Sequence, residues 1–134
     1  MPAITPPARS LRVWLDLARA GNFPSVASNA LTALVLASAA GPSWPAAGPL
    51  VLAIAAACLM YAGGATFNDV ADAGFDAQHR PERAIPRQAV TRAAASIVAG
   101  LEMALGAGIL IAAGAAAGWA AALIANILVY DWIH

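Results

Sequence analysis

The sequence is poor in charged residues and contains no lysine. Only 10% of its 134 residues are charged and 61% are hydrophobic, whereas an ordinary soluble domain has about 25% charged residues. This composition is typical of an integral membrane protein. The formal net charge is zero and no basic run is present, so no patch could neutralise nucleic-acid phosphates. We therefore expect no nucleic-acid partner.

The sequence has a single cysteine, and residues 9–23 do not have the pattern of a secretion signal. Cys58, the single cysteine, lies in an apolar run and can form no disulfide within the chain, so the redox compartment stays open. We interpret it as a packed residue of a membrane helix. Residues 9–23 lack both a continuous apolar core and a small-residue cleavage site, which excludes a signal peptide there.

Long apolar runs are abundant, and they predict four membrane-crossing helices. The first covers residues 24–40 and the second residues 47–67, each near the roughly 20 residues needed to cross the hydrocarbon core. Residues 93–133 form one run that is too long for a single crossing. We divide it at residues 114–119, where two glycines and a tryptophan favour a tight turn between two helices.

The residues before the first span predict a short amphipathic helix on the membrane surface. Four apolar residues recur at helical spacing: Leu11, Trp14, Leu15 and Ala18. The opposite face carries four charged residues: Arg9, Arg12, Asp16 and Arg19. Such a helix lies in the interface with its apolar side towards lipid. The expected fold class is therefore all-α, a polytopic membrane helix bundle of about four transmembrane helices plus this surface helix.

The arginines predict the orientation of the bundle. Three precede the first span and four lie between the second and third, whereas the connections at residues 41–46 and 114–118 carry none. By the positive-inside rule, the N-terminus and the loop after the second span both face the cytoplasm. An even number of spans separates them, so the two assignments agree. We expect a multi-pass protein of the cell (inner) membrane.

One stretch, NDVADAGFDAQHRPERAIPRQAV at residues 68–90, concentrates charge in this apolar chain. If the second helix continues past Phe67, one face carries four oxygen-bearing side chains: Asn68, Asp69, Asp72 and Asp76. Carboxylates this close repel unless protons or cations intervene, and Mg²⁺ prefers oxygen ligands completed by substrate phosphates. Arginines follow these carboxylates in the sequence, and arginine pairs well with phosphate. The stretch therefore predicts a diphosphate site. A solvated acidic loop, or a set of Asp–Arg pairs, is the alternative.

This stretch closely resembles the first aspartate-rich motif of UbiA-type membrane prenyltransferases, which reads NDxxDxxxD and precedes an arginine- and proline-rich segment. Every fixed position is matched, by Asn68, Asp69, Asp72 and Asp76. Arg83 matches the arginine before the usual proline. Two positions depart from the pattern, because Ala84 stands where proline is usual and Gln88 where glycine is usual. These departures concern the backbone of the loop more than metal ligation.

Two further segments resemble the same family. The segment RAGNFPSVASNAL is similar to the start of the family's first helix, and it contains Arg19, Asn22, Pro24 and Asn29. In LVYDWIH, Tyr130 is similar to the tyrosine of the fourth-helix region, and His134 stands at or next to its basic position. Within the family, the segment FDAQHRPERAIP (residues 75–86) is most similar to the UbiA-like branch found in bacterial Ebo-type clusters.

The resemblance implies a Mg²⁺-dependent transfer of a prenyl group from an allylic (poly)prenyl diphosphate to an acceptor that the sequence does not identify. It implies three metal ligands: Asn68, Asp72 and Asp76. The catalytic carboxylates would be Asp69, Asp72 and Asp76. Substrate would contact Arg19, Asn29, Arg80, Arg83 and Tyr130. The lipid bilayer is the other partner, and the oligomeric state stays open.

Family members form a larger bundle with two facing aspartate-rich motifs. Residues 1–134 resemble its N-terminal half and hold no second motif, so we expect one incomplete prenyltransferase domain that is inactive alone. A noncatalytic four-helix membrane protein is the alternative. A cation transporter is disfavoured, because it would hold its carboxylates near the midplane.

Two polar residues lie within the predicted spans. Glu102 either faces a cavity of the bundle or is protonated and hydrogen-bonded, and both interpretations stay open. We interpret Asn126 as a residue that hydrogen-bonds between helices.

Overall fold

The computed structural model describes residues 11–39 and 46–133, and all regular secondary structure in this part of the chain is helical. The helices, in chain order, are α1 (Leu11–Leu17), a 3-10 turn η1 (Ala20–Asn22), α2 (Phe23–Ala39), α3 (Ala47–Ala71), α4 (Ala73–His79), α5 (Arg92–Ala112) and α6 (Ala117–Ile133). The all-α prediction is confirmed.

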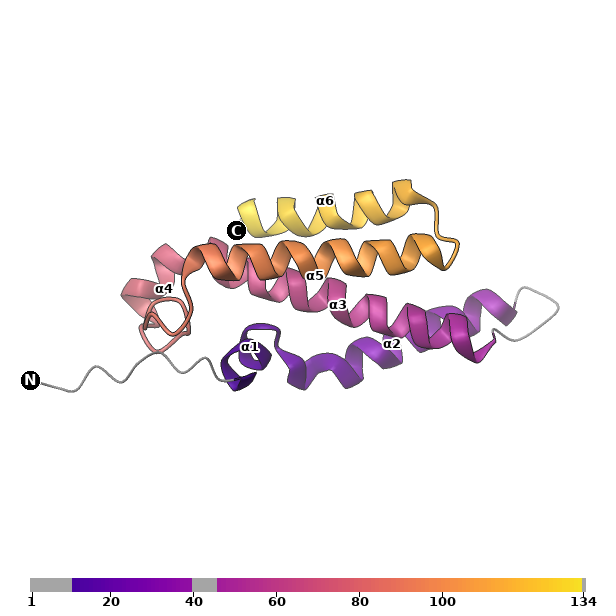
Figure 1. Cartoon of the computed structure of the whole chain (residues 1–134), viewed down its shortest axis with the longest axis horizontal. Coiled ribbons are helices and arrows are strands. Elements are labelled where there is room, and N and C mark those ends of the chain that lie inside the picture. The colour runs from indigo at the N-terminus through magenta and orange to yellow at the C-terminus, as the bar shows by residue number, and fades with distance from the viewer. Residues whose placement is uncertain (1–10, 40–45, 134) are drawn as a thin grey trace, which may run out of the picture.

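The α3 helix is the centre of the bundle (Figure 1). It packs most extensively against α5, which runs antiparallel to it, and it also contacts α2 and α6. Because α6 turns back beside α5, it runs parallel to α3 (Figure 1). The C-terminal ends of α3 and α6 therefore lie at the same end of the bundle as α4.

Small residues bring α3 and α5 into close contact. A Cβ atom added at Gly63 would lie 2.6 Å from Cγ of Met103, and one added at Gly106 would lie 2.9 Å from Cγ of Met60. Small residues at helix interfaces are typical of membrane bundles, where backbones approach closely to gain van der Waals contact. The pairing of α3 with α5 thus depends on two glycines, one on each helix.

The α1 helix forms as predicted, but its buried face differs from the predicted one. Val13 and Leu17 are buried against Val70, Val90 and Ala95, residues of α3, α5 and the loop between them. By contrast, two of the four residues predicted to be its apolar face, Leu11 and Leu15, are exposed. The tertiary contact selects a stripe of α1 that faces the bundle, which helical spacing alone cannot do. Arg9 lies outside the described residues.

Two of the four predicted spans, α3 and α5, are long and apolar enough in the described residues to cross a membrane. The α2 and α6 helices have 17 residues each. A helix of that length rises about 25 Å, somewhat less than a hydrocarbon core of about 30 Å. The crossing of the membrane by α2 and α6 therefore stays a prediction, and residue 40, the predicted end of the first span, lies outside the described residues.

The predicted turn within the long apolar run is present. The α5 helix ends at Ala112 and α6 begins at Ala117. Between them Gly114 has φ 98°, a conformation that glycine adopts without steric cost. The local sequence thus determines where the run divides.

Large apolar side chains cover the outside of the helices. On α5 they include Ile97, Leu101 and Leu105, each more than half exposed, and α6 exposes Trp132 and Ile133. Exposed apolar surface on this scale requires a nonaqueous environment or a partner. This surface fits helices that contact lipid.

Candidate active site

The aspartate-rich motif begins near the end of α3 and continues into α4. The N–H of Asp72 donates to the Asn68 carbonyl (2.9 Å), and the N–H of Asp76 donates to the Asp72 carbonyl (2.8 Å), so helical hydrogen bonding continues across the junction. The prediction that the motif residues share one helical face requires a helix that extends past Phe67, and α3 does extend to Ala71. Asn68, Asp72 and Asp76 follow one another by one helical turn each.

Arginine side chains surround two of the three aspartates. Arg83 Nη1 donates to Asp69 Oδ1 (2.7 Å) and lies 3.4 Å from Asp76 Oδ2. Arg80 Nη1 lies 3.6 Å from the other oxygen of Asp76, whose side chain is 1% exposed. The arrangement contains the Asp–Arg pairs that the sequence left open as an alternative. Arg83 joins the end of α3 to α4.

Arg19 reaches the motif from the junction of α1 and α2. Its Nη2 donates to Asn68 Oδ1 (3.0 Å) and to Asp69 Oδ1 (3.3 Å). Asn68 Nδ2 in turn donates to Asp72 Oδ2 (3.4 Å). Arg19 has φ 48° and ψ 45°, a left-handed conformation that costs a non-glycine residue about 1–2 kcal/mol. This backbone conformation places the guanidinium group across the bundle, against α3.

The loop after α4 keeps a left-handed residue where the family pattern has glycine. Gln88 has φ 60°. The N–H groups of Ala89 and Val90 both donate to the Ala84 carbonyl, at 2.9 Å and 3.3 Å, and close the turn around Gln88. Glutamine in place of the usual glycine therefore leaves the turn intact. The cost is that a residue with a Cβ atom adopts a backbone conformation that favours glycine.

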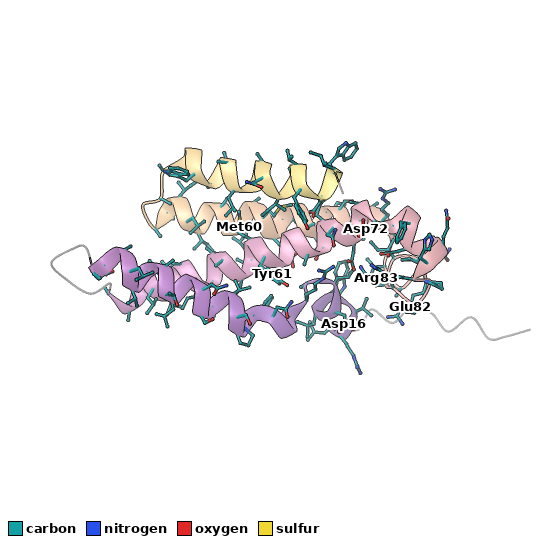
Figure 2. The ribbon with its side chains drawn as sticks, turned by 180° about the vertical axis from the view of Figure 1, so that it is seen from behind. Asp16, Met60, Tyr61, Asp72, Glu82 and Arg83 are labelled. Atoms are coloured by element: carbon teal, nitrogen blue, oxygen red, sulfur yellow. The ribbon has the colours of Figure 1, made fainter. Side chains whose placement is uncertain are left out.

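A cavity of about 500 Å³ lies between α3 and α6. Its apolar walls are formed by Ala57, Met60, Gly64, Ala65, Leu123 and Ile127. Its polar lining residues are Arg19, Tyr61, Asn68, Asn126, Tyr130 and Asp131. Figure 2 shows Met60 and Tyr61 along α3, with Asp72 and Arg83 further on at the charged end of the bundle. The cavity thus has a long apolar part and one charged end.

A smaller cavity of about 280 Å³ lies on the other side of Arg19. Arg83 and Arg87 contribute to its walls, together with Asp16, Asp69 and Glu82. Figure 2 shows Asp16, Glu82 and Arg83 gathered at the same end of the molecule. Charged side chains are therefore concentrated at this end, next to the motif.

The predicted substrate-binding residues fall into two groups. Arg19 and Tyr130 line the larger cavity, and Arg83, which pairs with Asp69, lines the smaller one. Arg80 lies further out, 6.0 Å from the ring centre of Phe75. Asn29 is exposed on α2 and lines neither cavity. Another asparagine of the same segment, Asn22, donates to the hydroxyl of Tyr61 (2.6 Å), and His134 lies outside the described residues.

Comparison with known proteins identifies the family of this chain. Residues 29–134 match the UbiA prenyltransferase family. The chain belongs to this family. No curated protein and no solved structure matches the chain. UbiA proteins are membrane transferases that act on prenyl diphosphates and typically depend on Mg²⁺, and the two apolar helices agree with a membrane protein.

The donor atoms fit the UbiA metal in chemistry, but they are fewer than the sequence suggested. In residues 11–39 and 46–133, no three His, Cys, Asp or Glu side chains are grouped so that they could hold a metal ion. Asp69 and Asp76 face arginines, and the Asn68 amide oxygen accepts a hydrogen bond from Arg19. Among the described residues, Asp72 is the carboxylate of the motif that no arginine pairs with. Oxygen donors of this kind suit Mg²⁺, which takes few protein ligands and completes its shell with water and phosphate.

Sequence reasoning missed one residue that lines the cavity of this UbiA protein. Asp131 lines the large cavity and is 7% exposed. An ionisable residue inside an apolar run is a functional candidate by default, and that signal was present in residues 117–133. Asn126 also lines the cavity, and its hydrogen bonding between helices stays a prediction. Glu102, half-buried on α5, lines neither cavity.

Proposed function

We propose that this chain forms the diphosphate-binding part of a UbiA prenyltransferase, which moves a prenyl group from an allylic diphosphate to an acceptor. One observation carries the proposal: Arg19 joins the aspartate-rich motif to the charged end of an apolar cavity. An amphipathic substrate with a hydrocarbon tail and a diphosphate head matches this division of the cavity.

The arginines are the groups that would bind the diphosphate. Arg19 and Arg83 present guanidinium groups, which pair with phosphate oxygens through charge-assisted hydrogen bonds. Asp69 accepts hydrogen bonds from both, so it holds the two guanidinium groups in place before substrate arrives. Preorganised donors of this kind stabilise charge that develops on a leaving group.

Asn68 and Asp72 are the residues that would hold Mg²⁺ together with the substrate. The ion would supply Lewis-acid chemistry by neutralising charge on the diphosphate. Asp76 pairs with Arg80 and Arg83, and its direct binding of metal stays a prediction. Asp69 supports the site through the arginines in this proposal.

The apolar walls of the cavity would protect the reacting carbon. The bond between the prenyl carbon and the diphosphate oxygen breaks, the acceptor forms a bond to that carbon, and the acceptor's proton is released. Exclusion of water keeps the allylic carbon from being hydrolysed. The rings of Tyr61 and Tyr130, both in the cavity wall, could stabilise positive charge on it.

The membrane arrangement belongs to the same proposal. The α2, α3, α5 and α6 helices cross the cell (inner) membrane, and α1 lies at its surface. The charged end, which contains Arg19, Arg80 and Arg83, faces the cytoplasm, as the positive-inside rule requires. The chain is the N-terminal part of one prenyltransferase domain, whose second aspartate-rich motif would face the first.

Calorimetric titration of Mg²⁺ tests this function. Affinity for Mg²⁺ should be weak in the chain alone and much stronger with a nonreactive prenyl diphosphate analogue, because the analogue supplies the missing oxygens. Asp72→Asn should abolish most of that gain. Equal Mg²⁺ affinity with and without the analogue would overturn the proposal.

A noncatalytic membrane protein is the second candidate. The Asp–Arg pairs at Asp69 and Asp76 favour it, because their charges are already compensated without substrate. The same titration separates the two candidates. A structural protein would show no coupling between Mg²⁺ and the diphosphate analogue.

A further inference from the structure

Asp131 is a buried carboxylate on α6, one turn beyond Ile127. The residue is 7% exposed, and its Oδ2 atom is buried and accepts no hydrogen bond from the described residues. A buried charge is unfavourable unless a cation or hydrogen-bond donors compensate it. Because Asp131 lines the large cavity, a ligand in that cavity can supply the compensation.

The register between α3 and α6 places Asp131 beside the aspartate-rich motif. A Cβ atom added at Gly64 would lie 3.1 Å from Cγ2 of Ile127, so these two residues face each other. The two helices run parallel (Figure 1), and one turn further along each lie Asn68 and Asp131. Both residues line the same cavity. Asp131 therefore lies at the level of Asn68, which donates to Asp72.

The charges around Asp131 point to a cation. Its carboxylate is repelled by Asp72 and attracted by Arg19. Arg19 is already hydrogen-bonded to Asn68 and Asp69. Asp72, at the end of α3, and Asp131, on α6, are thus two carboxylates that repel each other near Asn68. Such carboxylates repel each other unless a cation intervenes.

We propose that Asp131 is an additional oxygen ligand, direct or through one water, of the divalent cation held by Asn68 and Asp72. The inference rests on the proposed function, since the cation arrives with a diphosphate. It adds a residue from α6 to a site whose other protein ligands come from the end of α3. The bound ion then links α3 to α6 and covers the charged end of the cavity.

Mn²⁺ is the probe for this ligand, because its electron paramagnetic resonance signal reports binding directly. The full chain is titrated with Mn²⁺ in detergent micelles, in the presence of a nonreactive prenyl diphosphate analogue. Asp131→Asn should weaken Mn²⁺ binding about 10- to 100-fold, as the loss of a metal-supporting carboxylate commonly does. Asp131→Glu should restore part of the affinity. Glu102→Gln, a half-buried carboxylate away from the cavity, should bind as the unsubstituted chain does.

Thermal unfolding gives a second readout that a merely structural residue would not produce. Asp131→Asn should raise the melting temperature without metal, because it removes a buried repulsion with Asp72. It should also reduce the rise in melting temperature that Mg²⁺ and the analogue cause together.

The possible failures are distinguishable. Unchanged Mn²⁺ affinity in Asp131→Asn overturns the inference and leaves the proposed function standing. Absence of Mn²⁺ binding by the unsubstituted chain with the analogue overturns both.

Discussion

Arg83 compensates two carboxylates at once. Its Nη1 lies 2.7 Å from Asp69 Oδ1 and 3.4 Å from Asp76 Oδ2, and both aspartates are largely buried. Removing one partner of a buried ion pair typically costs about 3–5 kcal/mol, and the cost here lies at the lower end because Arg19 and Arg80 still face Asp69 and Asp76. Arg83→Ala should therefore lower the free energy of unfolding by about 3 kcal/mol. Tryptophan fluorescence during denaturation in mixed micelles measures this.

Arg87 is the matched control for Arg83. It lies in the same loop, is exposed and makes no ion pair with the described residues. Arg87→Ala should change the free energy of unfolding by no more than about 0.5 kcal/mol. Equal losses for the two variants would show that Arg83 acts only through the general charge of the loop.

Gln88 offers a test of backbone strain. With φ 60°, it occupies a conformation that costs a residue with a Cβ atom about 1–2 kcal/mol and costs glycine little. Gln88→Gly should raise the free energy of unfolding by about 1 kcal/mol, measured in the same micelles. Gln78→Gly, in the helical conformation of α4, should lower it by a similar amount. A loss of stability in Gln88→Gly would contradict this account of the turn.

The packing of α3 on α5 is the principal interaction at the level of helices. At Gly63 an added Cβ atom would meet Met103 Cγ at 2.6 Å and the Ala99 carbonyl oxygen at 2.8 Å. Contacts this short force the helices apart, and overpacking of this kind typically costs about 1–3 kcal/mol. Gly63→Ala should therefore destabilise the bundle by about 2 kcal/mol in a denaturant titration.

Gly100→Ala is the control for that interface. Gly100 lies on α5, and no described atom comes within 4 Å of a Cβ added there. Alanine is a better helix former than glycine, so this variant should be unchanged or slightly more stable. If Gly63→Ala is equally well tolerated, close packing of α3 and α5 is not what holds these helices together.

At the scale of the whole molecule, charge distribution predicts topology. The charged end contains α4, and the turn between α5 and α6 lies at the opposite end (Figure 1). In a Cys58→Ser background, Gln78→Cys should be protected in intact cells from a membrane-impermeant thiol reagent, whereas Ala115→Cys should be labelled. Both positions are exposed, so access is set by the membrane. Labelling of both positions alike would contradict the proposed orientation.

Local properties of the sequence determine much of this protein. Apolar runs set where the helices form, and the glycine-containing stretch after Ala112 sets where the long run turns. The spacing of Asn68, Asp72 and Asp76 is also local, because helical geometry relates residues four apart wherever the helix is placed. The family likewise follows from the motif and is confirmed over residues 29–134.

Tertiary structure decides which partners these residues meet. Arg19 contacts Asn68 and Asp69 across 49 and 50 positions of the chain, and the register of α6 on α3 brings Asp131 to the same place. Hydropathy also cannot choose which stripe of α1 is buried, because Leu11 and Val13 are both apolar. Such contacts depend on how helices pack, and packing is set by side-chain shape at distant positions. Which side chains of the motif pair with arginines is therefore a property of the folded bundle.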